Sequence, residues 1–167
     1  MQPLVKPGSQ GEAIGRLVVA GIVVTMLSAL PFGNYLMYPF AILTTWFHEM
    51  GHGLTAVLLG QHFEQLMIFP NGSGVAESRL SGEASRFTYG AIAAGGPLAP
   101  SAVGALLIIA SAHPRAWRPV LWLSAAAILA SVIIWVRSPT GYWALPLVAA
   151  ILGLIAWRAA PGFARFS

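Results

Sequence analysis

The sequence predicts an all-α polytopic membrane protein with about five transmembrane helices and a short β-hairpin-like insertion after the second. The first observation behind this prediction is composition: of 167 residues, 57% are hydrophobic and 8% are charged, whereas soluble domains carry about 25% charged residues. Such a chain cannot cover a globular surface with polar groups, so lipid is its expected solvent. The second observation is that apolar segments recur at lengths near the roughly 20 residues that a helix needs to cross a bilayer.

Five apolar segments approach the length of a membrane-spanning helix. The last two are short, so they can be tilted, extended at their ends or partly re-entrant. Aromatic residues lie near several predicted ends, as is typical of the membrane–water interface, and these are Trp117, Tyr142, Trp143 and Trp157. The predicted spans are about Ile14–Phe32, Leu36–Gly60, Tyr89–Ala112, Val120–Val136 and Tyr142–Trp157.

The first segment could also be the apolar region of a signal peptide. Because "LSALPFG" at its end lacks a clean small-x-small cleavage site, we interpret it as a retained helix. The basic residues orient the chain only weakly, since an N-terminus inside leaves five of the nine Lys and Arg inside and four outside. We favour the N-terminus inside, and we expect residues 1–167 to form a single membrane-embedded domain.

The polar stretch from Gln61 to Glu83 interrupts the pattern of spans and holds three of the five glutamates. Within it, "QLMIF" is typical of a strand, "PNGSG" contains an Asn-Gly turn signal, and "VAESRL" can form the returning strand. A hairpin lying against the membrane-embedded core is one interpretation, and an ordinary polar loop is the other.

Residue usage excludes several functions. There is no cysteine, so disulfides, thiolate metal ligands and a cysteine nucleophile are impossible. The net charge of +4 comes from scattered Lys and Arg that form no basic run of the kind that binds nucleic acid. We therefore expect no nucleic-acid partner.

One short motif concentrates polar residues inside an apolar segment. His48-Glu49-Met50-Gly51-His52 fits the pattern H-E-x-x-H. Residues four apart lie on one helix face with Cβ atoms about 5–6 Å apart, so His48 and His52 can bind one Zn²⁺. Glu49 can then act as general base toward a water that zinc has acidified. The alternative is that these histidines only form hydrogen bonds between helices, but a carboxylate inside a membrane is costly without a partner or a cavity.

The segments "FHEMGHGLTAVLLGQ", "IFPNGSGVA" and "YGAIAAGGPLAPSAVGALL" resemble the site-2-protease-type intramembrane metalloproteases, and most closely their small bacterial M50B-like branch. The resemblance covers about residues 40–110, and "VRSPTGYW" adds a fainter likeness. In that family the motif lies on a transmembrane helix, and a later helix begins with a Gly-Pro signature, which here is Gly95-Gly96-Pro97. The resemblance implies that His48 and His52 are zinc ligands and that Glu49 is the general base.

The chain departs from this family at the third metal ligand. Relatives supply an aspartate from a late Asp-Gly motif, whereas this chain has no aspartate and carries Thr140 at the matching place in "SPTG". Pro100 stands where relatives often carry an asparagine. A catalytic zinc normally has three protein ligands, so another residue or another chain must complete the set. The candidates left open are Glu64, Glu77, Glu83, His62, His113 and, as a poor ligand, Thr140.

The resemblance implies a zinc-dependent protease that cleaves membrane proteins or peptides within or beside the bilayer, in a bacterial inner (plasma) membrane. By the same resemblance, the insertion would help to hold an unwound substrate by strand addition. One alternative is a catalytically impaired pseudoprotease of the same fold that binds a membrane partner. Another is a small transporter or channel, although nothing in the sequence indicates the paired broken helices of such proteins.

Overall fold

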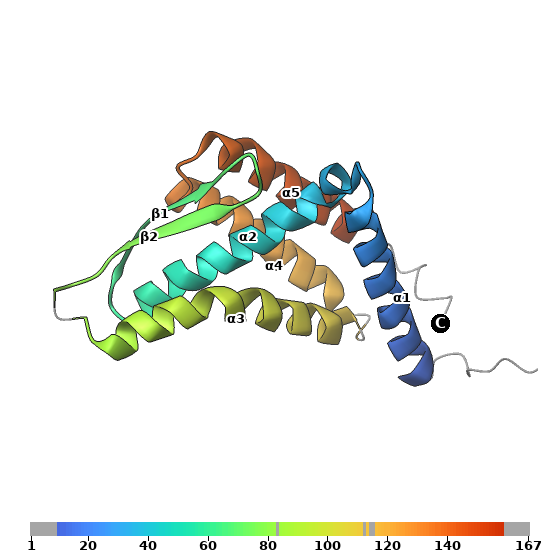
Figure 1. The fold of residues 1–167 in the computed structure, drawn as a ribbon, viewed down its shortest axis with the longest axis horizontal. Helices are drawn as coiled ribbons and strands as arrows, with labels where there is room; N and C mark the ends of the chain where they lie inside the picture. Colours follow the sequence, from blue (N-terminus) through green and yellow to red (C-terminus); the bar gives the residue numbers. More distant parts are fainter. Residues whose placement is uncertain (1–9, 83, 112, 114–115, 159–167) are drawn as a thin grey trace, which may run out of the picture. The chain divides into compact units, whose positions relative to one another are not determined.

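The computed structural model describes residues 10–82, 84–111, 113 and 116–158 (Figure 1). The described residues up to Tyr38 belong to one compact unit and those from Pro39 onward to a second, and each unit is described by itself. In chain order the elements are α1 (Gln10–Ala29), α2 (Gly33–Leu58), β1 (His62–Ile68), β2 (Gly74–Arg79), α3 (Arg86–Ser111), α4 (Trp117–Ile134) and α5 (Pro139–Arg158).

The first unit contains α1 and the first turns of α2. Two hydroxyl side chains of α1 are satisfied by carbonyls of the same helix, as an apolar solvent requires. The Thr25 hydroxyl donates to the Gly21 carbonyl at 2.9 Å, and the Ser28 hydroxyl donates to the Val24 carbonyl at 2.8 Å. These bonds fit a helix whose apolar side chains face lipid.

Among the described residues, four helices are long and apolar enough to cross a membrane, namely α1, α3, α4 and α5. The predicted helical membrane architecture is therefore confirmed, but the predicted count of five spans is not. The segment that does not qualify is α2, whose apolar character is interrupted by His48, Glu49 and His52. The two segments that looked short in the sequence form helices of 18 and 20 residues, because each begins three residues before its predicted start, although α4 ends at Ile134, two residues before its predicted end.

The polar insertion forms the predicted β-hairpin. Strand β1 pairs with β2 in antiparallel register, with Leu66 opposite Ala76. The connecting turn places Gly72 at φ +84°, a conformation that glycine adopts without steric cost. Asn71 stabilises the turn because its side-chain oxygen accepts a hydrogen bond from the Ser73 backbone N–H at 3.0 Å, a typical Asx turn.

The connection between α4 and α5 lies along the free edge of β1. The Leu66 N–H donates to the Trp135 carbonyl at 2.9 Å, and the Arg137 N–H donates to the Leu66 carbonyl at 3.0 Å, which makes Val136 a one-residue parallel extension of the sheet. The Ser138 hydroxyl accepts a hydrogen bond from the Ile68 N–H at 2.9 Å. The segment "VRSPTG" therefore anchors the hairpin to the helices.

The core of the second unit joins the hairpin to α2, α4 and α5. Leu66, Ile128 and Leu145 are fully buried, and the Phe63 ring stacks on Trp135 with centroids 5.1 Å apart. The Trp46 indole N–H donates to the Ser131 hydroxyl at 2.8 Å. This bond fixes α2 against α4 two residues before the histidine motif.

Candidate metal centre

The motif residues lie on the second half of α2, in the part of the helix that packs against α3 and the hairpin. Met50 and Gly51 are buried, and Glu49 is only 9% exposed. His48 and His52 are half-buried. The helix therefore places two imidazoles and one carboxylate where contact with solvent is limited.

The two histidine side chains converge on one point. Their Nε2 atoms lie 3.1 Å apart and their ring centroids 4.8 Å apart. Two nitrogens that bind a tetrahedral zinc ion at 2.0–2.1 Å stand about 3.3 Å from each other. The spacing of this pair therefore fits two ligands of one zinc ion without a change of helix geometry.

The orientation of His52 is fixed by a residue forty positions further along the chain. Its Nδ1 lies 2.7 Å from the Ile92 carbonyl oxygen, and because a carbonyl can only accept, Nδ1 must carry the hydrogen. The lone pair of Nε2 then points toward His48, where it accepts a hydrogen bond from His48 Nε2, and a metal that displaces this hydrogen could bind both nitrogens. Hydrogen bonds of this kind orient most metal-binding histidines in proteins.

Three glycines allow α2 and α3 to approach closely at the motif. A Cβ atom built on Gly51 would collide with the Gly95 carbonyl of α3, and one built on Gly95 would collide with Gly51 and Thr55. A Cβ atom on Gly96 would overlap the Nε2 edge of the His52 ring. The glycine signature lies inside α3, more than two turns after the helix begins at Arg86, and it leaves open the space beside the nitrogen that would bind a metal.

The Glu49 side chain extends from α2 toward the start of β2. Its Cγ atom is 2.8 Å from the position that a Cβ of Gly74 would occupy, so the strand begins directly over the glutamate. Within the described part of the chain, its carboxylate forms no hydrogen bond or ion pair. Since no buried side-chain oxygen among the described residues lacks a hydrogen-bond partner, the Glu49 carboxylate must keep contact with solvent, where it can exchange a proton with a substrate.

The hairpin is held over this site by two further contacts. The Thr45 hydroxyl donates to the Gly72 carbonyl at 2.6 Å, which fixes the turn one helical turn before Glu49. At the other end, the Phe63 ring packs directly on Gly53, where any Cβ would overlap it. Neither contact can be read from the sequence. Gly53, directly after the motif, does indicate that another element packs closely there.

The described residues contain no group of three His, Cys, Asp or Glu side chains that could hold a metal ion, so none of the third-ligand candidates there joins the pair. Glu64 forms an ion pair with Arg79 on the exposed hairpin, and Glu77 accepts a hydrogen bond from Gln65. His62 is exposed in β1 and His113 is exposed beyond the end of α3. Thr140 is buried in the first turn of α5, and Glu83 lies outside the described residues.

Fold and site together define a class: helical membrane proteins with a His-Glu-x-x-His helix that packs against a glycine-rich helix and a small hairpin. The family model described as Peptidase M50B-like matches residues 17–167. The chain therefore belongs to the M50B-like peptidase family, which confirms the resemblance to the site-2-protease type. No curated protein and no solved structure matches the chain.

Proposed function

We propose that this protein hydrolyses peptide bonds within or beside the membrane, with zinc held by His48 and His52 and with Glu49 as general base. The observation that carries the proposal is the pair of imidazole Nε2 atoms 3.1 Å apart, with Glu49 next to His48 in the chain. Membership of a peptidase family supports the assignment.

When bound, zinc supplies a Lewis acid that activates water at neutral pH and stabilises negative charge on a scissile carbonyl. Glu49 accepts the proton of the attacking water and delivers it to the leaving amine. Its carboxylate has no hydrogen-bond partner within the described residues and therefore keeps contact with solvent, which leaves it available for both transfers. The Ile92 carbonyl holds His52 in the tautomer that presents Nε2.

The outer edge of β2 is suited to hold an extended substrate. Leu66 directs its N–H and carbonyl toward the α4–α5 connection, so Leu66 and Ala76 form a non-hydrogen-bonded pair across the hairpin. In such a pair both residues direct their backbone groups away from the partner strand. The Ala76 N–H and carbonyl therefore face outward, on the strand that begins over Glu49, and can pair with an unwound segment of a membrane protein.

A pseudoprotease of the same fold is the second candidate function. It is favoured by one observation, the lack of a third protein ligand beside His48 and His52 among the described residues. Two imidazoles hold zinc more weakly than the usual set of three ligands. In that case the hairpin edge would still bind a membrane partner, without cleavage. For either function we propose a bacterial inner membrane as the location.

The test uses the full-length protein purified with zinc supplied. Metal content is measured for wild type, His48→Ala, His52→Ala and Glu49→Gln, and cleavage is measured on reconstituted single-span test proteins with an unstructured segment next to the membrane. We expect Glu49→Gln to retain zinc and to lose cleavage, whereas the histidine variants lose both.

Each other outcome leads to a definite conclusion. Wild-type protein that holds zinc but cleaves none of the test proteins would support the pseudoprotease. Equal cleavage by wild type and Glu49→Gln would reject Glu49 as the base. Wild-type protein without zinc, under conditions where zinc is supplied, would reject the metal site itself.

A further inference from the structure

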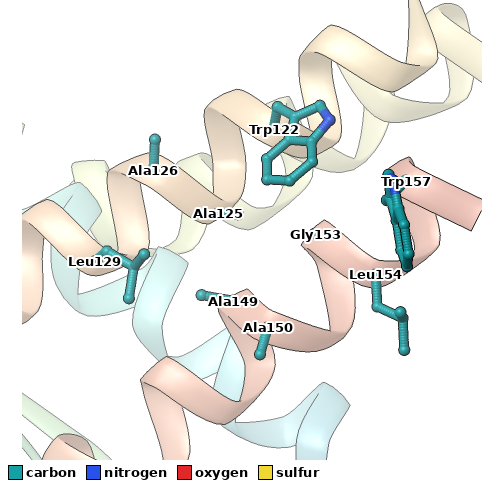
Figure 2. A pocket seen from close by; sticks show the side chains of 9 residues that line it. All are labelled: Trp122, Ala125, Ala126, Leu129, Ala149, Ala150, Gly153, Leu154 and Trp157. Atoms are coloured by element: carbon teal, nitrogen blue, oxygen red, sulfur yellow. The ribbon is translucent and has the colours of Figure 1, made fainter.

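An apolar groove separates α4 from α5 on the second unit. Its cavity has a volume of about 510 Å³, within the range of small-molecule pockets. Figure 2 shows the two tryptophans of the groove at the same end and Leu129 at the opposite end of the α4 side. The lining residues are Trp122, Ala125, Ala126, Leu129, Ala149, Ala150, Gly153, Leu154 and Trp157.

The groove exists because both helices carry small residues where they face each other. Gly153 lies under the Trp122 ring, so that even a Cβ atom there would be 3.3 Å from the ring carbon Cζ3. Ala126 and Ala150 are exposed on the two walls. In a bilayer these exposed walls open toward lipid, and the groove must be filled by something other than this unit's own side chains.

The length of the groove fits within one leaflet of a bilayer. On α4 it runs from Trp122 to Leu129 and on α5 from Ala149 to Trp157, which corresponds to about 10–12 Å at 1.5 Å per residue. One leaflet of the hydrocarbon core is about 15 Å thick. A partner transmembrane helix would need a contact face along the full thickness of the bilayer, whereas an acyl chain stays within one leaflet.

Positive charge lies at the tryptophan end of the groove. Arg118 precedes Trp122 by one helical turn, and its Nε donates to the Ala156 carbonyl of α5 at 2.9 Å, so its guanidinium bridges the two helices there. Arg158 follows Trp157 directly and is exposed. Neither arginine forms an ion pair within the described residues, and no acidic residue follows Glu83 in the sequence.

We propose that this groove binds an anionic glycerophospholipid. One acyl chain lies between α4 and α5, and the phosphate is bound by Arg118 and Arg158. Guanidinium groups bind phosphate through paired, charge-assisted hydrogen bonds, and tryptophans at the same level place this end at the membrane–water interface. Because neither arginine has a carboxylate partner within the described residues, a lipid phosphate can supply the counter-charge.

The experiment measures quenching of tryptophan fluorescence in the full-length protein by lipids with brominated acyl chains. The protein is reconstituted in phosphatidylcholine vesicles that contain a small fraction of either brominated phosphatidylglycerol or brominated phosphatidylcholine. We expect phosphatidylglycerol to quench at about tenfold lower content, as expected for added hydrogen bonds to a charged group. Arg158→Gln and Arg118→Gln should each remove much of this preference, and Arg86→Gln, with the same loss of charge at the start of α3, should keep it.

A second pair of variants tests the location. Ala126→Leu combined with Ala150→Leu fills the groove from its exposed walls and should reduce quenching by phosphatidylglycerol. Ala127→Leu, exposed on the same helix but outside the groove, should leave it unchanged. Equal quenching by the two lipids would overturn the proposal, because the groove would then hold only ordinary bilayer lipid. Groove-filling variants that are quenched like wild type would also overturn it. So would wild-type protein that self-associates and that the groove-filling variants turn into monomers, because a second copy of the chain would then occupy the groove.

Discussion

Replacing Gly96 with alanine should displace His52 and weaken zinc binding. A Cβ atom at this position would lie 2.7 Å from Cδ2 of the imidazole and closer still to Cε1 and Nε2, whereas ordinary contact begins at 3.4 Å. The ring must therefore retreat by about 0.7 Å or more at Cδ2, while metal–ligand distances tolerate only about 0.2 Å. We expect zinc affinity to fall on the order of 10- to 100-fold, as it does when the surroundings of a ligand are disturbed.

The measurement is a zinc titration of detergent-purified protein by isothermal calorimetry, with a competing chelator. The matched control is Gly104→Ala on the same helix, where a new Cβ meets nothing within 4 Å. Both substitutions raise helix propensity by the same amount, so a difference between them reports the contact with His52. If Gly96→Ala bound zinc as tightly as Gly104→Ala and wild type, the reasoning about this contact would be wrong.

Three further predictions concern the hairpin and the metal. Thr45→Val removes the hydrogen bond to the Gly72 carbonyl and should lower the free energy of unfolding, measured by denaturant titration, by about 1–2 kcal/mol. The control Thr44→Val, at the exposed neighbouring residue, should lower it less. Ala76→Pro removes an outward N–H from the edge of β2 and should reduce cleavage of test proteins, whereas Ala76→Ser, which keeps that N–H, should cleave normally; equal rates would exclude strand addition at this edge. Chelation should abolish cleavage, and zinc but not magnesium should restore it; activity that persists in chelator would contradict a metal mechanism.

Much of the fold could be predicted from local patterns. Apolar length predicted the helices, and "PNGSG" predicted the turn between two strands, which the structure confirms at Gly72. The predicted count of five spans was not confirmed, because α2 is long enough but its apolar run is interrupted by His48, Glu49 and His52. The helix ends shifted by a few residues because polar residues such as Arg86 and Arg158 continue the helices beyond their apolar runs.

The third-ligand candidates show where sequence reasoning reached its limit. Glu64 and Glu77 follow the motif closely in the chain, and proximity in sequence made them plausible ligands. The hairpin instead pairs them on its own exposed surface, with Arg79 and Gln65. Strand pairing decides this outcome, because the register sets which side chains meet across the hairpin.

The sequence by itself determined a helical membrane protein with two imidazoles on one helix face, because four residues make about one turn in any α-helix. Only the tertiary structure decided that His52 is held by the Ile92 carbonyl, that Gly96 leaves room beside its Nε2, and that β2 begins over Glu49. The physical reason is the distance along the chain between the residues that interact. Helical periodicity follows from backbone geometry that every residue shares, whereas these contacts join segments 25 to 44 residues apart and depend on how closely two helices and a hairpin pack.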